Sequence, residues 1–202
     1  AKAGTTTLYD ILRQHRQIFL PVAKEPAFFC DDEYYEQGAE WYWKTHFADA
    51  PAEALAGEAT STYLFWGSKV VPRLEAAYGS RPPRIVVIFR EPVSLVHSFY
   101  WHSVREARES LPFREALEAE AARLQEHEAF LRRRGRIVYA YRQIGNYAAH
   151  LRPWLERWPR EQFLFLLTSD LRDFARLQRT LEAFLAGPLA AAPVAAPAAG
   201  RR

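Results

Sequence analysis

Ala1-Lys2-Ala3-Gly4-Thr5-Thr6-Thr7-Leu8 opens the chain, and this stretch predicts a phosphate-binding loop that runs into a helix. The glycine lets the backbone turn tightly and approach an anion closely. The threonine amides fall on the first helical turn, where N–H groups have no intrahelical partner and the helix dipole adds partial positive charge. The lysine adds a mobile point charge. The alternative interpretation is a threonine-rich helix start beside a solvated lysine.

The loop departs from the nucleotide-binding pattern G-x-x-x-x-G-K-[ST]. Its lysine precedes the glycine, and no second glycine frames the loop. This difference argues against an ordinary ATPase or GTPase. We expect the helix after the loop to cover residues 6–15, because Leu8, Ile11 and Leu12 form an apolar stripe.

Ile85-Val86-Val87-Ile88-Phe89 is continuously apolar and rich in β-branched residues, which predicts a central parallel strand buried on both faces. A second buried strand is expected at residues 163–167. Helical patterns at 33–47, 68–78, 146–158 and 174–185 alternate with these strands. The alternation predicts an α/β fold of the P-loop-like, three-layer kind, in which helices flank a central, mostly parallel sheet.

The remaining segments are less regular. Residues 18–22 contain Pro21 and predict at best an edge strand, and 55–63 predict a short strand that leaves into a polar loop. Residues 105–136 are charge-rich and predict solvated helix faces. Residues 137–141 alternate like a strand, but the segment is short and its structure stays open. In the helix at 146–158, one face collects Tyr147, Leu151, Trp154, Leu155 and Trp158.

Arg90 stands at the carboxyl end of the first strand, with Pro92 at the first turn of the next helix and Ser98 farther along it. Ligands of parallel sheets bind beyond the carboxyl ends of the strands. An arginine and a serine beside a phosphate loop suggest a second phosphate site. Two phosphate sites on one nucleotide imply a bisphosphate ligand.

Length, cysteine count and net charge limit the classes of protein and of site that this chain can form. The chain has 202 residues, enough for one domain with a sizeable core, and it contains no run of 18 apolar residues. Cys30 is the only cysteine, which excludes an intrachain disulfide and a cysteine metal cluster. The net charge of +3 suits an anionic ligand but is too small and scattered to imply nucleic-acid binding.

The ends of the chain differ from its middle. We expect a domain at residues 1–187 and an Ala/Pro-rich, low-complexity tail at 188–202. The chain lacks methionine and begins inside a motif, so we expect a fragment whose first strand precedes residue 1. The expected location is cytoplasmic, or the Golgi lumen if a preceding segment carries a membrane anchor.

In these features the chain resembles the sulfotransferases that use 3'-phosphoadenosine 5'-phosphosulfate, and especially the branch of heparan sulfate N- and O-sulfotransferases and their bacterial relatives. The resemblance covers nearly all of residues 1–187, in order. The matching segments are 2–8, Glu25 with Phe28-Phe29, 38–42, 58–63, 85–100, 146–158, 163–167 and 169–185.

The resemblance implies transfer of a sulfuryl group from 3'-phosphoadenosine 5'-phosphosulfate to a hydroxyl or amine, on a saccharide or small hydroxylated molecule. It leaves adenosine 3',5'-bisphosphate and needs no metal. The implied catalytic residues are Lys2 and Glu25. The implied cofactor-binding residues are Lys2, Ala3, Gly4, Thr5, Thr6, Thr7, Arg90 and Ser98, and the implied substrate contacts are Glu58, Trp41 and Tyr63.

The general base is the least direct of these assignments. An attacking hydroxyl needs a base within hydrogen-bond reach. Glu25 is favoured because glutamates before an aromatic pair act as bases in the resembling enzymes, and Phe28 and Phe29 offer it an apolar wall. The alternative for Glu25 is a salt bridge with Lys24 or Lys44. Glu58 is the rival carboxylate.

The aromatic residues also leave two interpretations. Trp41, Tyr42, Trp43 and Trp66 form either a sugar-stacking cleft or part of the core. The chain departs from the family at Ala59, where a lysine is usual, and its basic C-terminal loop is missing unless residues 200–202 begin it. Two other functions stay open: a P-loop nucleotide phosphotransferase with Asp170 as magnesium ligand, and a degenerate, non-catalytic carbohydrate- or nucleotide-binding domain.

Overall fold

The structure is a computed structural model that describes residues 2–79 and 83–185. The expected tail at 188–202 therefore lies outside the described residues. The principal elements, in chain order, are α1 (Thr5–Arg13), β1 (Ile18–Phe19), α2 (Asp32–Tyr35), α3 (Gly38–His46), β2 (Leu55–Ala56), α4 (Gly67–Tyr78), β3 (Ile85–Phe89), α5 (Pro92–Arg105), α6 (Phe113–Glu118), α7 (Glu120–Glu126), α8 (Glu128–Arg133), α9 (Tyr147–Arg157), β4 (Phe163–Leu167) and α10 (Phe174–Leu185). Short 3-10 turns lie at Gln143–Gly145, Arg160–Gln162 and Thr168–Arg172.

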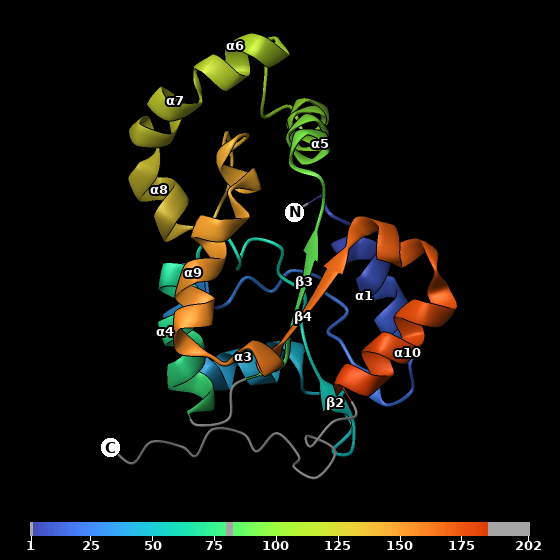
Figure 1. Ribbon diagram of the computed structural model, residues 1–202. Coiled ribbons are helices and arrows are strands. Elements are labelled where there is room, and N and C mark those ends of the chain that lie inside the picture. The colour runs from blue at the N-terminus through green and yellow to red at the C-terminus, as the bar shows by residue number, and fades with distance from the viewer. Residues whose placement is uncertain (1, 80–82, 186–202) are drawn as a thin grey trace.

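Strands β3 and β4 pair in parallel at the centre of the molecule, in the register Ile85↔Phe163 to Phe89↔Leu167. Helices α1 and α10 cover one face of this pair, and α3, α4 and α9 lie on the other (Figure 1). Alternate residues of β3 serve the two layers: Val87 joins the core of α3, α4 and α9, while Ile88 joins the core of α1 and α10. The α/β prediction and the burial of β3 on both faces are confirmed.

One expectation for the strands is wrong, and one expected edge strand is shorter than its predicted bounds. Within the described residues, β3 pairs with β4 alone, so it is not a central strand there. The edge strand expected at residues 18–22 shrinks to β1, which pairs in parallel with β2. The pairing of β1 with β2 stops because Pro21 has no N–H to donate. The Pro21 carbonyl oxygen accepts a hydrogen bond from the Tyr9 hydroxyl.

The helix expected at 33–47 is divided into α2 and α3, because Gly38 has a left-handed φ of 84°. Residues 137–141 form turns rather than a strand. Leu155 is 43% exposed, since the core face of α9 is centred on Trp154 and Trp158. At Gly67, an added Cβ would lie 2.4 Å from the Trp154 indole nitrogen, which shows how closely α4 and α9 approach.

The charge-rich segment at 105–136 is not uniformly solvated. Glu109 and Glu120 are buried beside a second core that is formed by α5, α6 and the turns at 137–144. Glu109 accepts hydrogen bonds from Tyr141 and Arg123, and Glu120 accepts from the backbone of Arg142. Buried charges are kept where such partners compensate the loss of water, a condition that helical periodicity does not report.

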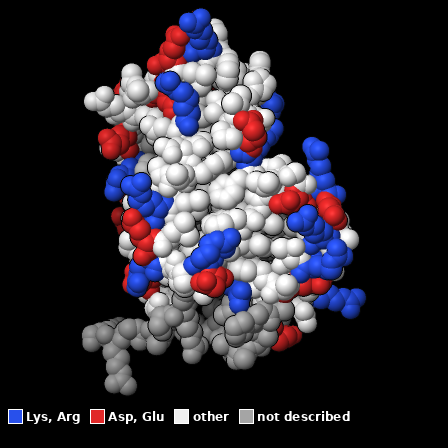
Figure 2. Space-filling view, in the orientation of Figure 1, with Lys and Arg blue, Asp and Glu red and all other residues white. Residues whose placement is uncertain are grey.

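Elsewhere on the surface, basic and acidic side chains are intermixed over the face that Figure 2 shows. In residues 2–79 and 83–185, no helix combines the length and the apolar character needed to cross a membrane.

Candidate active site

The predicted phosphate loop has the backbone that an anion site requires. Gly4 has a φ of 102° and stands at the N-terminus of α1, where its carbonyl accepts from the Leu8 amide at 3.1 Å. A Cβ at Gly4 would lie 2.4 Å from Leu171 Cδ1, which is the end of a flexible side chain, so it is the positive φ that requires glycine. Ala3 is buried, and its carbonyl lies 2.8 Å from the Thr168 hydroxyl, which lies 3.0 Å from the Phe89 carbonyl. The loop is therefore fixed to the carboxyl ends of β3 and β4.

Arg90 links β3 to the loop. Its guanidinium Nη1 donates to the Lys2 carbonyl at 3.0 Å. Its backbone is held from the other side by the Tyr147 hydroxyl, which accepts from the Arg90 amide at 3.1 Å and donates to the Arg90 carbonyl at 3.0 Å. Arg90 thus supports the loop as well as carrying charge beside it.

Helix α5 brings two polar side chains to the same hollow. Pro92 begins the helix, and the Glu91 carboxylate caps it by accepting from the amides of Val93 and Ser94 at 2.8 and 2.7 Å. Hydrogen bonds from Ser94 hold the pKa of Glu91 below its usual value. Ser98 and His102 then lie one helical turn apart and both line the pocket.

Glu25 enters the pocket from the loop after β1. Its carboxylate oxygens lie 3.0 and 3.1 Å from the Ser61 hydroxyl, and one of them lies 3.3 Å from Lys24 Nζ. Lys24 also donates to Thr6 Oγ1 at 2.9 Å, which connects the base candidate to the phosphate loop. Glu25 therefore both lines the pocket and forms a salt bridge with Lys24.

The apolar wall expected beside Glu25 is not formed. Phe28 and Phe29 are buried in the core against Tyr42, while Glu25 is exposed among polar neighbours. Glu25 and Ala27 both have left-handed φ values, of 60° and 58°. This backbone turns the carboxylate to the pocket and the aromatic pair inward. For residues other than glycine such a conformation costs about 1–3 kcal/mol, and it is found most often where function demands it.

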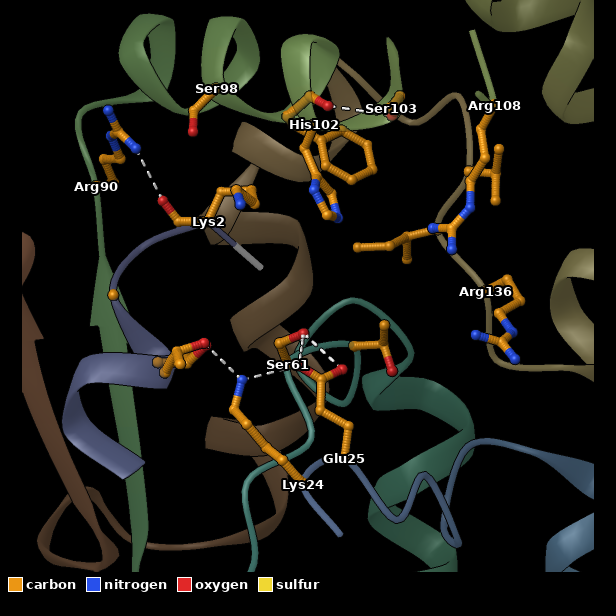
Figure 3. Close-up of a pocket in the computed structure, with 17 residues that line it drawn as sticks. Lys2, Lys24, Glu25, Ser61, Arg90, Ser98, His102, Ser103, Arg108 and Arg136 are labelled. Carbon is orange, nitrogen blue, oxygen red and sulfur yellow. Dashed lines mark hydrogen bonds and ion pairs between the residues drawn. The ribbon is translucent and has the colours of Figure 1, made fainter. Parts of the chain in front are cut away.

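These residues surround one pocket of about 500 Å³. Figure 3 shows Lys2, Arg90 and Ser98 on one side, Arg108 and Arg136 on the other, and Lys24, Glu25 and Ser61 between them. Among the described lining residues, five are lysine or arginine, and Glu25 is the one acid: Lys2, Lys24, Glu25, Arg90, Arg108 and Arg136. The pocket is therefore built for an anionic ligand.

The charges of the pocket act on one another. Burial, followed by the positive charges of Arg105, Arg90 and Lys24, lowers the pKa of Lys2. Burial and the nearby Lys2 charge lower the pKa of His102. A bound anion would relieve the repulsion at Lys2, and His102 is a neutral proton acceptor near pH 7.

Seven of the residues expected in the site line this pocket: Lys2, Gly4, Thr5, Thr6, Glu25, Arg90 and Ser98. Five others that were expected do not line it. Ala3 contributes buried backbone, Thr7 is exposed on α1, and Trp41 stacks on Tyr34 within the aromatic cluster beside α3. Glu58 and Tyr63 are hydrogen-bonded to each other at 2.7 Å, away from the pocket.

Sequence reasoning did not assign Ser61, His102, Arg108 or Arg136 to the site. Ser61 lies inside a family-like segment, which was a usable signal. The arginines belong to a charge-rich region in which nothing in the pattern distinguishes them. Trp66 packs in the core, as do Tyr42 and Trp43. Asp170, the magnesium ligand that a kinase would need, accepts from the Leu167 amide at 2.7 Å. No group of three potential metal-ligating side chains occurs in the described ranges.

Comparison with known proteins agrees with this geometry. A family described as "Sulfotransferase domain" matches residues 1–190. Heparan sulfate glucosamine 3-O-sulfotransferase 3B1 of Mus musculus is 30% identical over 196 residues, which cover 89% of this chain and 45% of that protein. Bifunctional heparan sulfate N-deacetylase/N-sulfotransferase 2 of Bos taurus is 26% identical over 178 residues, which cover 85% of this chain and 19% of that protein.

The chain thus spans less than half the length of these curated relatives. Among solved structures, a sulfotransferase from Alicyclobacillus acidocaldarius is similar with a TM-score of 0.78 and 30% sequence identity. That similarity covers 100% of this chain and 82% of the other.

Proposed function

This chain belongs to the sulfotransferase domain family, and we propose that it transfers a sulfuryl group from 3'-phosphoadenosine 5'-phosphosulfate to a hydroxyl or amine of a saccharide. The observation that carries this proposal is the convergence of a helix-start phosphate loop, Arg90 with Ser98, and Glu25 on one cationic pocket. The donor is general for the family, whereas the proposed acceptor and residue roles rest on the pocket of this chain.

The residues present fit a donor with phosphates at two ends. The amides at the start of α1 and the hydroxyls of Thr5 and Thr6 suit one phosphate, because N–H groups at a helix start have no intrahelical partner and these residues line the pocket. When bound, the donor supplies a sulfuryl group on an anionic leaving phosphate. Lys2 would neutralise the charge that gathers on that leaving group, which is the main protein contribution in such transfers.

Arg90 and Ser98 suit the second phosphate. A guanidinium has five N–H donors, and the Lys2 carbonyl engages Nη1 of Arg90. Ser98 lies on the pocket face of α5, across from this guanidinium (Figure 3). A phosphate between them would accept charge-assisted hydrogen bonds from the arginine and a further bond from the hydroxyl.

Glu25 would accept the proton of the attacking hydroxyl. It is the one acid that lines the described pocket, and Ser61 and Lys24 hold its oxygens in place. Lys24 bridges Glu25 and Thr6, so the base and the phosphate loop keep a fixed separation. His102 lines the same pocket and is the second candidate base.

The acceptor side is formed by Arg108 and Arg136. Both are exposed, and their guanidinium groups border the pocket opposite Lys2 and Arg90 (Figure 3). The donor phosphates do not need these two guanidinium groups. The two cations therefore suit a saccharide that bears carboxylate or sulfate groups. Several relatives are named for heparan sulfate, which supports an anionic saccharide as the acceptor of this chain as well.

A binding experiment separates this function from its alternatives. Adenosine 3',5'-bisphosphate should raise the melting temperature of the chain, whereas ATP with Mg²⁺ should not. The reverse result would indicate a nucleotide phosphotransferase. Binding of the bisphosphate without release of it from 3'-phosphoadenosine 5'-phosphosulfate in the presence of anionic saccharides would indicate a non-catalytic binding domain.

A further inference from the structure

The segment at 58–63 forms hydrogen bonds with the loop that carries Glu25. The Ala27 amide donates to Thr60 Oγ1 at 3.1 Å, and the Phe29 amide donates to the Tyr63 hydroxyl at 3.2 Å. The two segments are more than 30 positions apart in sequence, and the contacts fall on alternate residues of the loop. The loop therefore depends on hydroxyl oxygens for two of its backbone donors.

The Glu58 carboxylate lies behind these hydroxyls. Its Oε1 accepts from the Tyr63 hydroxyl at 2.7 Å and from the Tyr42 hydroxyl at 3.0 Å, and its Oε2 accepts from Thr60 Oγ1 at 2.9 Å. Burial raises the pKa of Glu58, and the hydrogen bonds from Tyr63, Thr60 and Tyr42 oppose that shift. Three donors thus converge on the carboxylate of a half-buried residue.

The chemistry of these groups fixes the direction of each hydrogen bond. An ionised carboxylate only accepts, whereas a hydroxyl has one proton to donate and lone pairs with which to accept. Because Thr60 and Tyr63 give their protons to Glu58, their oxygens are left to accept the loop amides. A side chain with donor groups at position 58 would compete for those lone pairs.

We propose that Glu58 is a positioning residue that, through the hydroxyls of Thr60 and Tyr63, holds the loop presenting Glu25 to the pocket. The loop needs such support, because Glu25 and Ala27 both adopt left-handed backbone conformations. The catalytic consequence of this role rests on the function proposed above for Glu25. The structural role does not, so it is tested separately.

The test is residue-resolved hydrogen exchange in Glu58→Gln, which keeps the shape of the side chain and adds donors. The amides of Ala27 and Phe29 should exchange roughly tenfold faster than in the parent chain. Glu109→Gln is the matched control, because Glu109 is a buried carboxylate that accepts from Tyr141 and Arg123 in a different network. In Glu109→Gln, the exchange rates of the Ala27 and Phe29 amides should change only as far as the global stability of that variant changes.

Single-hydroxyl variants keep the proposal testable if Glu58→Gln does not fold. Thr60→Val should accelerate exchange at Ala27 alone, and Tyr63→Phe should accelerate it at Phe29 alone. Thr60→Ser should restore the protection of Ala27. Unchanged exchange at both amides in these variants would overturn the proposal.

Kinetics then separates the positioning role from the function of Glu25. In Glu58→Gln, kcat for sulfuryl transfer should fall while the Kd for adenosine 3',5'-bisphosphate stays within about twofold of the parent. Faster exchange with an unchanged kcat would keep Glu58 as the support of the loop and remove Glu25 as the base. A lower kcat with unchanged exchange would remove the positioning role.

Discussion

The Arg90 guanidinium donates to the carbonyl oxygen of Lys2 at 3.0 Å, across 88 positions of sequence. The strand-end arginine is therefore part of the support of the phosphate loop, and the effects of changing it extend to both ends of the proposed donor site.

Arg90→Ala should weaken binding of adenosine 3',5'-bisphosphate by about 2 kcal/mol, the worth of a charge-assisted hydrogen bond. It should weaken binding of adenosine 5'-monophosphate by only about 0.5–1 kcal/mol, because the lost bond to the Lys2 carbonyl supports the loop indirectly and does not touch that nucleotide. Ser98→Ala is the matched control and should affect only the bisphosphate. Titration calorimetry with both nucleotides checks the difference, and equal losses would make Arg90 purely a support of the loop.

Lys2→Ala should lower kcat by a factor on the order of 100, as for other preorganised charges at a leaving group. The pKa of Lys2 is lowered by burial and by neighbouring cations, so its charge is lost at a lower pH than that of an ordinary lysine. Bisphosphate binding should therefore weaken as the pH rises, beginning below the usual lysine value of 10.5. Lys2→Arg should bind the bisphosphate without this alkaline decline, and a decline of the same size in that variant would exclude Lys2 as its cause.

Glu25→Gln should keep binding of the donor product and lose most sulfuryl transfer, by about 10²–10⁴-fold, because the carboxylate would be the proton acceptor. His102→Asn tests the second candidate base, which lines the same pocket. It should lower kcat by less than Glu25→Gln does. The opposite order of the two effects, measured with the same saccharide, would transfer the role of base to His102.

Gly4→Ala should destabilise the chain by about 1–3 kcal/mol, because alanine is strained at positive φ. The new Cβ also meets Leu171 Cδ1, an atom at the end of a flexible side chain. Adding Leu171→Ala removes this contact but leaves the backbone strain at φ 102°. The double variant should therefore be no more stable than Gly4→Ala alone. Thermal unfolding of the single and double variants checks this, and recovery of parent stability in the Gly4→Ala background would mean that the contact alone requires glycine.

Much of the fold follows from local patterns. The run from Ile85 to Phe89 predicts β3, and the amphipathic spacings predict α4, α9 and α10 to within a residue or two, because one-sided burial leaves a regular mark on the sequence. The phosphate loop is equally local, since Gly4 and the α1 amides are neighbours in the chain. These features, with the resemblance to the sulfotransferases, predict the family, which the match over residues 1–190 confirms, while the donor end of the site stays a prediction.

The tertiary structure alone decided which charged groups meet. Only the family resemblance favoured Glu25 over Glu58 as the base. The packed chain shows that Glu25 lines the pocket, whereas Glu58 accepts hydrogen bonds from the hydroxyls of Thr60, Tyr63 and Tyr42. Likewise, Arg108 and Arg136 resemble every other arginine of their charge-rich region until the chain is packed. The reason is physical: periodicity reports which face of an element is buried, whereas a hydrogen bond between segments 33 positions apart depends on how whole elements pack.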